Sequence, residues 1–280
     1  MIVRITGALL RALLVALMVV TPSLLLPAVS ADTTQIVVLV ALIAGGFVFT
    51  EYNSRIPVLL EFRYAPPYNR LRFYTLFGIV LLLTTTQAGP ALDTPIADLF
   101  NSISRILATT IDFPYSPVRL ATLTLPAGSP VELVNAVRDA AGVAYIGGMI
   151  GVVVLALLIR LHRWPTRSGA FNVWVNLPMF EPTGGGDVLQ RLKRDAGLNV
   201  LLGFLLPFLT PPLFKLLTAA LAPLSLANPQ SMIWIMTAWA FIPANLIMRG
   251  IALSRIADLI GEKRRRTYAE EEPALHQHTA

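Results

Sequence analysis

The chain has 280 residues, of which 55% are hydrophobic and 14% are charged, and its mean hydropathy is +0.66. Soluble domains carry about 25% charged residues, so this composition predicts a polytopic membrane protein. The absence of cysteine excludes disulfides, iron–sulfur clusters and thiolate zinc sites, and the three histidines lie outside the hydrophobic runs, so we expect no metal and no cofactor.

The first 50 residues predict a helical hairpin. Arg4 and Arg11 precede an apolar stretch that predicts a helix over about 8–27. A signal peptide cleaved after Val29-Ser30-Ala31 is the alternative. A second hydrophobic run over 33–50 follows at once, and this favours a retained first helix.

Residues 51–72 mix arginine, tyrosine and proline, a composition typical of a loop at a membrane surface. A third helix is expected over 73–89. The segment 90–139 then contains Thr94-Pro95 as a helix start, followed by apolar residues at helical spacing opposite a polar face. This pattern predicts an amphipathic helix that lies on the outer surface or packs over the bundle. The proline-rich part from Phe113 to Pro130 predicts an ordered loop or lid.

The central helix is predicted over 140–161. Its run of apolar and small residues is long enough to cross a hydrocarbon core of about 30 Å. The preceding Ser129-Pro130-Val131-Glu132 is a capping-box pattern with proline at the first helical position. Arg160, Arg163 and Arg167 follow it, as is typical of a cytoplasmic helix end.

The loop 162–197 contains one alternating segment, 171–177, but a single strand with no visible partner is weak evidence for any sheet. It also contains Gly184-Gly185-Gly186-Asp187, which resembles the GxGD motif of membrane aspartyl proteases. Those enzymes need a second carboxylate, and no second aspartate lies in a predicted crossing. A glycine turn with Asp187 as a helix N-cap explains the same residues.

Two further helices are expected over 198–222 and 232–253. The last one continues to Ile260, with Gly261 as its stop. Residues 1–262 thus form one polytopic membrane domain, and the charged tail over 263–280 is predicted to be disordered.

The distribution of basic residues sets the orientation. Eighteen of the 22 lysines and arginines fall on one side if both termini are cytoplasmic, and three fall on the other. This bias predicts six crossings that form an all-α bundle with both ends inside. It also argues against nucleic acid as a partner, because no separate basic domain remains. The excess of arginine over lysine is typical of a GC-rich bacterial genome, so we expect the bacterial inner membrane.

Small residues form a stripe along the central helix. Such stripes let two helix backbones approach closely, either within the chain or with a partner protein. The members are Ala140, Ala144, Gly147, Gly148 and Gly151.

The fifth helix carries three prolines, each of which removes a backbone hydrogen bond. A kinked helix is the ordinary interpretation, and a broken helix lining a substrate path is the alternative. That path would comprise Pro207, Thr210, Pro211, Pro212, Lys215 and Asn245. Lys215 lies near the outer end, where it can instead extend to the interface.

Basic residues at the cytoplasmic end of the sixth helix suit anionic lipid headgroups as well as topology anchoring. They are Arg255, Lys263, Arg264, Arg265 and Arg266.

The leading functional hypothesis is a non-enzymatic membrane protein that associates with, scaffolds or helps to assemble a larger membrane complex. It rests on the small-residue stripe and on the few polar groups inside the runs. A small secondary transporter or channel that uses the fifth helix is the alternative. An enzyme ranks third, because Asp187 is the only carboxylate that the sequence nominates.

Overall fold

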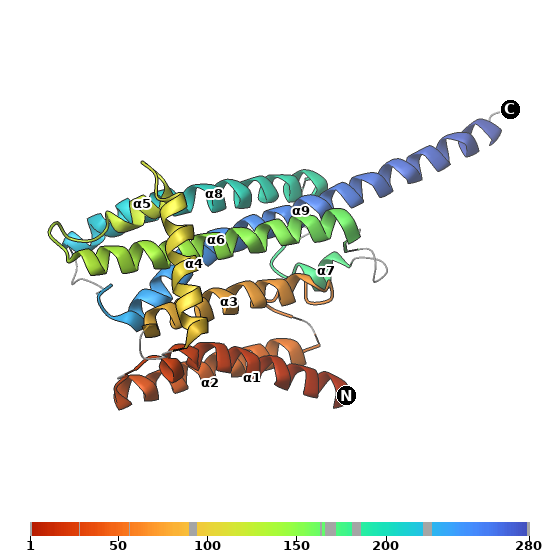
Figure 1. The fold of residues 1–280 in the computed structure, drawn as a ribbon. Helices are drawn as coiled ribbons and strands as arrows, with labels where there is room; N and C mark the ends of the chain where they lie inside the picture. The colour runs from red at the N-terminus through yellow and green to blue at the C-terminus, as the bar shows by residue number, and fades with distance from the viewer. Residues whose placement is uncertain are drawn as a thin grey trace.

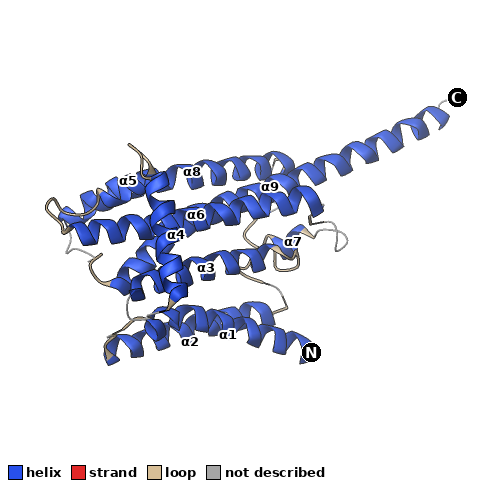
Figure 2. Cartoon of the chain, in the orientation of Figure 1, coloured by secondary structure: helices blue, strands red, loops and turns tan. Residues whose placement is uncertain are grey.

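The computed structural model describes residues 2–27, 29–55, 57–89, 94–162, 164–165, 172–180, 186–220 and 226–278. All regular structure in these ranges is helical, and no strand occurs among them (Figure 2). The helices are α1 (Ile2–Leu25), α2 (Ala31–Asn53), α3 (Tyr68–Ala88), α4 (Pro95–Ile111), α5 (Pro117–Thr122), α6 (Val131–His162), α7 (Val173–Asn176), α8 (Val188–Ala220) and α9 (Pro229–His278).

Six of the described helices are long and apolar enough to cross a membrane, namely α1, α2, α3, α6, α8 and α9. They run side by side (Figure 1). Lipid offers no hydrogen-bonding partners to the backbone, so a segment in a membrane must satisfy its own backbone groups, as a helix does. The expectation of helical structure with six long apolar helices is therefore confirmed for the described residues. Several of these helices begin earlier in the chain than the predicted hydrophobic runs do.

α6 lies at the centre of the bundle, where it packs against α3, α4, α5 and α9. It begins at Val131, where the sequence pattern predicts, but the predicted capping box does not form. The Ser129 hydroxyl donates to the carbonyl of Pro126 at 2.8 Å, because the chain turns tightly at Gly128, whose φ is +84°. The first turns of α6 extend beyond the predicted crossing. The crosswise helix α4 packs on α6 (Figure 1), where Gly142 lies beside Ala108.

α4 begins at the predicted cap, because the Thr94 hydroxyl accepts a hydrogen bond from the amide of Ala97. Its small residues Ala97, Ser104 and Ala108 are buried against the bundle. The proline-rich segment that follows, expected as a loop, contains the short helix α5, which the Ser116 hydroxyl caps at the amide of Arg119.

The alternation over 171–177 does not form a strand in the described residues of that segment. Val173–Asn176 form the single helical turn α7, because no other strand is available to complete a ladder. The amide of Phe62 donates to the carbonyl of Asn176 at 2.7 Å, and the Asn176 side chain accepts from the amide of Tyr64 at 3.0 Å. The turn therefore serves to hold the loop between α2 and α3.

The helix stop predicted at Gly261 is also wrong. α9 runs through Gly261, which keeps a helical backbone, and continues to His278 through the tail that was expected to be disordered. Leu189 of α8 packs beside Gly261, and the residues that follow are good helix formers. The end of α9 extends beyond the bundle (Figure 1).

Candidate functional site

The proline-rich part of α8 remains a continuous helix, and a neighbouring helix satisfies a group that the prolines leave free. Pro211 has no amide hydrogen to donate to the carbonyl of Pro207 four residues earlier. The indole Nε1 of Trp239 on α9 donates to that carbonyl at 3.3 Å. This is the outcome expected for a bent helix whose freed backbone groups find partners within the bundle.

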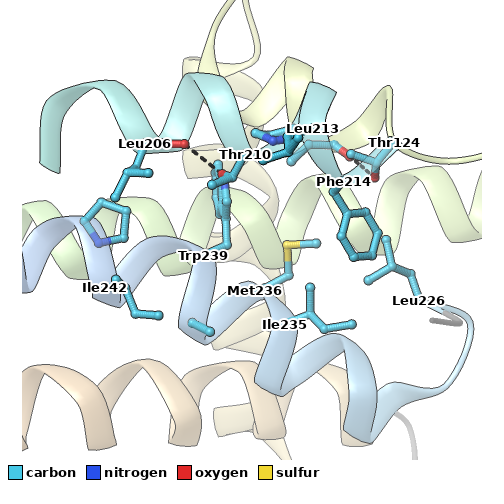
Figure 3. Close-up of a pocket in the computed structure, with 14 residues that line it drawn as sticks. Thr124, Leu206, Thr210, Leu213, Phe214, Leu226, Ile235, Met236, Trp239 and Ile242 are labelled. Atoms are coloured by element: carbon cyan, nitrogen blue, oxygen red, sulfur yellow. Dashed lines mark hydrogen bonds between the residues drawn. The ribbon is translucent and has the colours of Figure 1, made fainter. Parts of the chain in front are cut away.

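A cavity of about 370 Å³ lies between α8 and α9 and is bounded on one side by α5 (Figure 3). Met236, Trp239 and Phe214 contribute its largest side chains, and no charged side chain occurs among its lining residues. The Thr210 hydroxyl donates to the carbonyl of Leu206 at 2.7 Å, and the Thr124 hydroxyl donates to that of Ala121 at 2.7 Å. Because both hydroxyls are engaged by nearby backbone carbonyls, the cavity suits an apolar molecule such as a hydrocarbon chain.

The structure distributes the predicted path residues over several places. Thr210 and Pro211 line the cavity, whereas Pro212 is exposed on the other side of α8. Lys215 is exposed, and its Nζ donates to the carbonyl of Leu123 at 2.8 Å, so it ties α8 to the end of α5. Asn245 lies outside the cavity lining.

The small-residue stripe of α6 faces helices of the same chain. Ala140 and Ala144 are buried, and a Cβ on Gly148 would lie 3.2 Å from the backbone oxygen of Ala240 on α9. Side chains at Gly147 and Gly151 would meet α3 at Ile79 and Thr75. The close approaches that these residues permit are thus made within the bundle.

The basic residues in the C-terminal half of α9 have different surroundings. The Arg255 Nε donates to the carbonyl of Trp164 at 3.3 Å. Arg264 pairs with Asp187 at 2.7 Å, and this hydrogen bond, together with one from the amide of Leu189, lowers the pKa of the Asp187 carboxyl. Asp187 therefore caps α8 as predicted. Lys263, Arg265 and Arg266 are exposed along the same helix.

A buried ion pair that sequence reasoning missed lies at the level of the loop between α2 and α3. The Glu61 carboxylate accepts two hydrogen bonds from Arg249 of α9, at 2.6 and 2.7 Å. Glu61 is 8% exposed, and Asn69 donates to its backbone carbonyl. The signal available in the sequence was Arg249 itself. It is a single charged residue between the apolar part of the sixth predicted helix and the continuation of that helix to Ile260.

The same loop folds back on the end of α2 through a second carboxylate. Glu51 is buried and accepts from three successive amides, those of Val58, Leu59 and Leu60, at 3.1–3.2 Å. Arg63 donates to the carbonyls of Glu51, Tyr52 and Ser54, which are among the last ones of that helix. The carboxylates of Glu51 and Glu61 are therefore both engaged in holding the loop between α2 and α3.

An aromatic cluster completes this end of the bundle. The rings of Phe62 and Tyr68 lie 4.4 Å apart, and Trp164 lies 5.7 Å from Phe62. The Trp164 indole donates to the carbonyl of Ala65 at 3.0 Å. The cluster joins the loop between α2 and α3 to the residues that follow α6.

Comparison with known proteins finds no relative. The chain matches no family model, and neither a curated protein nor a solved structure is significantly similar to it.

Proposed function

We propose that the chain is a non-enzymatic, multi-pass protein of the bacterial inner membrane that associates with other integral membrane proteins, with both termini in the cytoplasm. The observation that carries this proposal is the weak attachment of α2. Among the described elements, α2 packs closely only against α1, and α1 in turn meets α3 and the start of α9.

The open side of α2 is continuous and apolar. Ile36, Leu39, Ile43 and Phe47 share one face at helical spacing and are each about half or more exposed. Gly46 lies on the same side with open space around its Cα, so another helix can approach closely there. We propose that this face receives a helix of a partner protein.

A groove between the hairpin and α9 supports the same proposal. It encloses about 620 Å³ and is lined by Val37 and Val40 of α2 and by Trp234 and Ile235 of α9. Gln230 bridges its outer end with a 3.0 Å hydrogen bond to Ser23 of α1. The hairpin is therefore held at that end while an apolar gap stays open beside it.

The chain's lack of cysteine allows a direct test of the α2 face. Leu39→Cys, labelled with a benzophenone maleimide in native membranes, should give one discrete protein adduct on irradiation. The matched control is Ala41→Cys, whose position is buried against the rest of the hairpin and should give none. If Leu39→Cys yields only lipid adducts, this face is a lipid-facing surface and the proposal fails.

The position of α4 supports an interfacial role for the outer segment. Its exposed residues divide into an apolar flank of Leu99, Ile103 and Ile106 and a polar flank that includes Asp98 and Arg105. A helix of this kind lies in the membrane interface with its apolar flank toward lipid. We propose that α4 lies along the outer face of the membrane and enlarges the protein surface that a partner can contact.

A small transporter or channel is the second candidate, and the cavity beside α8 is the observation that favours it. The apolar lining suits a hydrophobic solute better than an ion. Ala238→Phe, which places a ring in the cavity, should then abolish uptake of that solute by proteoliposomes. Equal uptake by this variant and the wild type would remove the cavity from any transport path.

A further inference from the structure

A second groove, at the end of the bundle where α8 begins, has a lining that changes in character along its length. It encloses about 910 Å³ between α8 and α9, with Ile159 of α6 at its side. Val200, Leu201 and Phe204 form its apolar part and are between 40% and 60% exposed. These three side chains lie about two to three turns along α8 from Lys193, which belongs to the polar part of the groove.

The polar part of the groove contains charges of both signs in a fixed order. Lys193 of α8 lies at the level of Ser254 and Arg255 of α9, because the two helices are antiparallel and Ala196 contacts Gly250. Asp258 follows Ser254 by four residues, or about 6 Å farther from the apolar part. The order is therefore apolar side chains, then two cations with a hydroxyl, then a carboxylate.

The polar groups of the groove have capacity left for a ligand. Arg255 uses its Nε for the carbonyl of Trp164, and within the described residues no bond of its two Nη groups occurs. Lys193 and Asp258 are exposed and form no ion pair within the same part of the chain. A phosphate at the level of Lys193 and Arg255 would gain charge-assisted hydrogen bonds, and an ammonium group one turn farther would face Asp258.

We propose that this groove binds an aminophospholipid, with its acyl chain on Val200, Leu201 and Phe204, its phosphate diester at Lys193, Ser254 and Arg255, and its primary ammonium at Asp258. Phosphatidylethanolamine has these groups in this order. An anionic lipid without an amine has no positive group for Asp258, and the negative charge of the lipid would repel the Asp258 carboxylate. A choline lipid presents a quaternary ammonium that has no hydrogen to donate to Asp258.

Gly197 provides the space in which the lipid glycerol region fits. It lies in the groove between the cationic and apolar parts, and an added Cβ would meet nothing within 4 Å. A large side chain at this position fills the groove without striking the bundle, so a variant can close the site and still fold.

The test measures lipid bound to the purified full-length chain by native mass spectrometry. The protein is exchanged in turn into detergent with phosphatidylethanolamine, phosphatidylglycerol or phosphatidylcholine. The wild type should retain one phosphatidylethanolamine in preference to the other two lipids. Gly197→Phe should lose this bound lipid, whereas the control Gly46→Phe, also at an open helical glycine but on α2, should retain it.

Charge variants test the contacts to the lipid phosphate and to the lipid ammonium separately. Lys193→Gln should weaken binding of phosphatidylethanolamine about tenfold, the loss expected for one charge-assisted hydrogen bond, and the neighbouring Arg194→Gln should not. Asp258→Asn should abolish the preference over phosphatidylglycerol while leaving a lipid bound. Equal retention of all three lipids by the wild type, or unchanged retention by both Gly197→Phe and Lys193→Gln, overturns the proposal. A protein adduct instead of a lipid adduct from benzophenone-labelled Gly197→Cys also overturns it, because the occupant would then be a partner helix.

Discussion

Glu61 and Arg249 are 188 positions apart in the chain and meet in two short hydrogen bonds. Their side chains are 9% and 27% exposed, so neither charge can recover its full hydration if the other is removed. A buried ion pair adds little net stability over apolar residues, but removing one partner is expensive because the other charge stays buried. This asymmetry makes the pair a sensitive probe of the described fold.

We expect Arg249→Ala to lower the free energy of unfolding by about 3 kcal/mol, because Glu61 would be left without its partner. Thermal unfolding of the detergent-solubilised protein measures this as a lower Tm. Glu61→Gln combined with Arg249→Gln should recover part of the loss. Arg194→Ala, which breaks an exposed pair with Asp195 of 3.8 Å, is the control and should cost less than about 1 kcal/mol. Equal effects of the two alanine variants would contradict the pairing.

The hydrogen bond from Trp239 to Pro207 predicts a coupling between three positions. Trp239→Phe removes the donor and should cost about 1 kcal/mol, the net value of one such bond. Pro211→Ala restores an amide hydrogen that can reach the same carbonyl. In the Pro211→Ala background, Trp239→Phe should therefore lower the free energy of unfolding by less than it does in the wild type. A double-mutant cycle on unfolding checks this, and strictly additive effects would show that the indole is not the partner of that carbonyl.

The residue-scale features that the sequence predicted are local ones. The Thr94 and Asp187 caps were predictable because a cap involves residues only two or three positions apart. The Glu61–Arg249 pair and the bond from Trp164 to Ala65 depend on how distant segments pack, so no spacing in the sequence encodes them.

At the scale of the elements, the contact between α4 and α6 depends on Gly142. A Cβ there would lie 2.6 Å from the Cα of Ala108, too close for a carbon–carbon contact. Gly142→Ala should therefore displace α4 and cost about 1–3 kcal/mol despite the higher helix propensity of alanine. The control is Gly78→Ala on α3, where nothing lies within 4 Å and stability should not fall. Both are measured by thermal unfolding, and equal Tm values for the two variants would contradict the contact.

The long apolar helices were predictable because their hydrophobicity alone identifies them in lipid. The short and amphipathic elements were not equally predictable. The alternation over 171–177 has the period of a strand, but Asn176 is instead used to bind the neighbouring loop. Gly261 has the composition of a stop, but packing against Leu189 supports a continued helix there. In both cases tertiary contacts outweighed local preference.

At the scale of the whole molecule, the proposed topology places α5 and the start of α8 on opposite sides of the membrane. Tyr115 is 84% exposed just before α5, and the Arg194 side chain is 72% exposed near the start of α8. In intact cells a membrane-impermeant maleimide should label Tyr115→Cys and not Arg194→Cys, while inverted vesicles should give the reverse. Labelling of both positions from one side would overturn the six-crossing arrangement.

The pairing of α1 with α2 also bears on how the chain is made. Both helices are made before the other described helices, and they form their closest contacts with each other. Glu51 and Arg63 then fasten the following loop with hydrogen bonds inside that same early portion. We therefore expect the first 65 residues to insert and persist as an independent unit during synthesis. Arg249 is made nearly two hundred residues later, and its hydrogen bonds to Glu61 then attach this unit to the finished bundle.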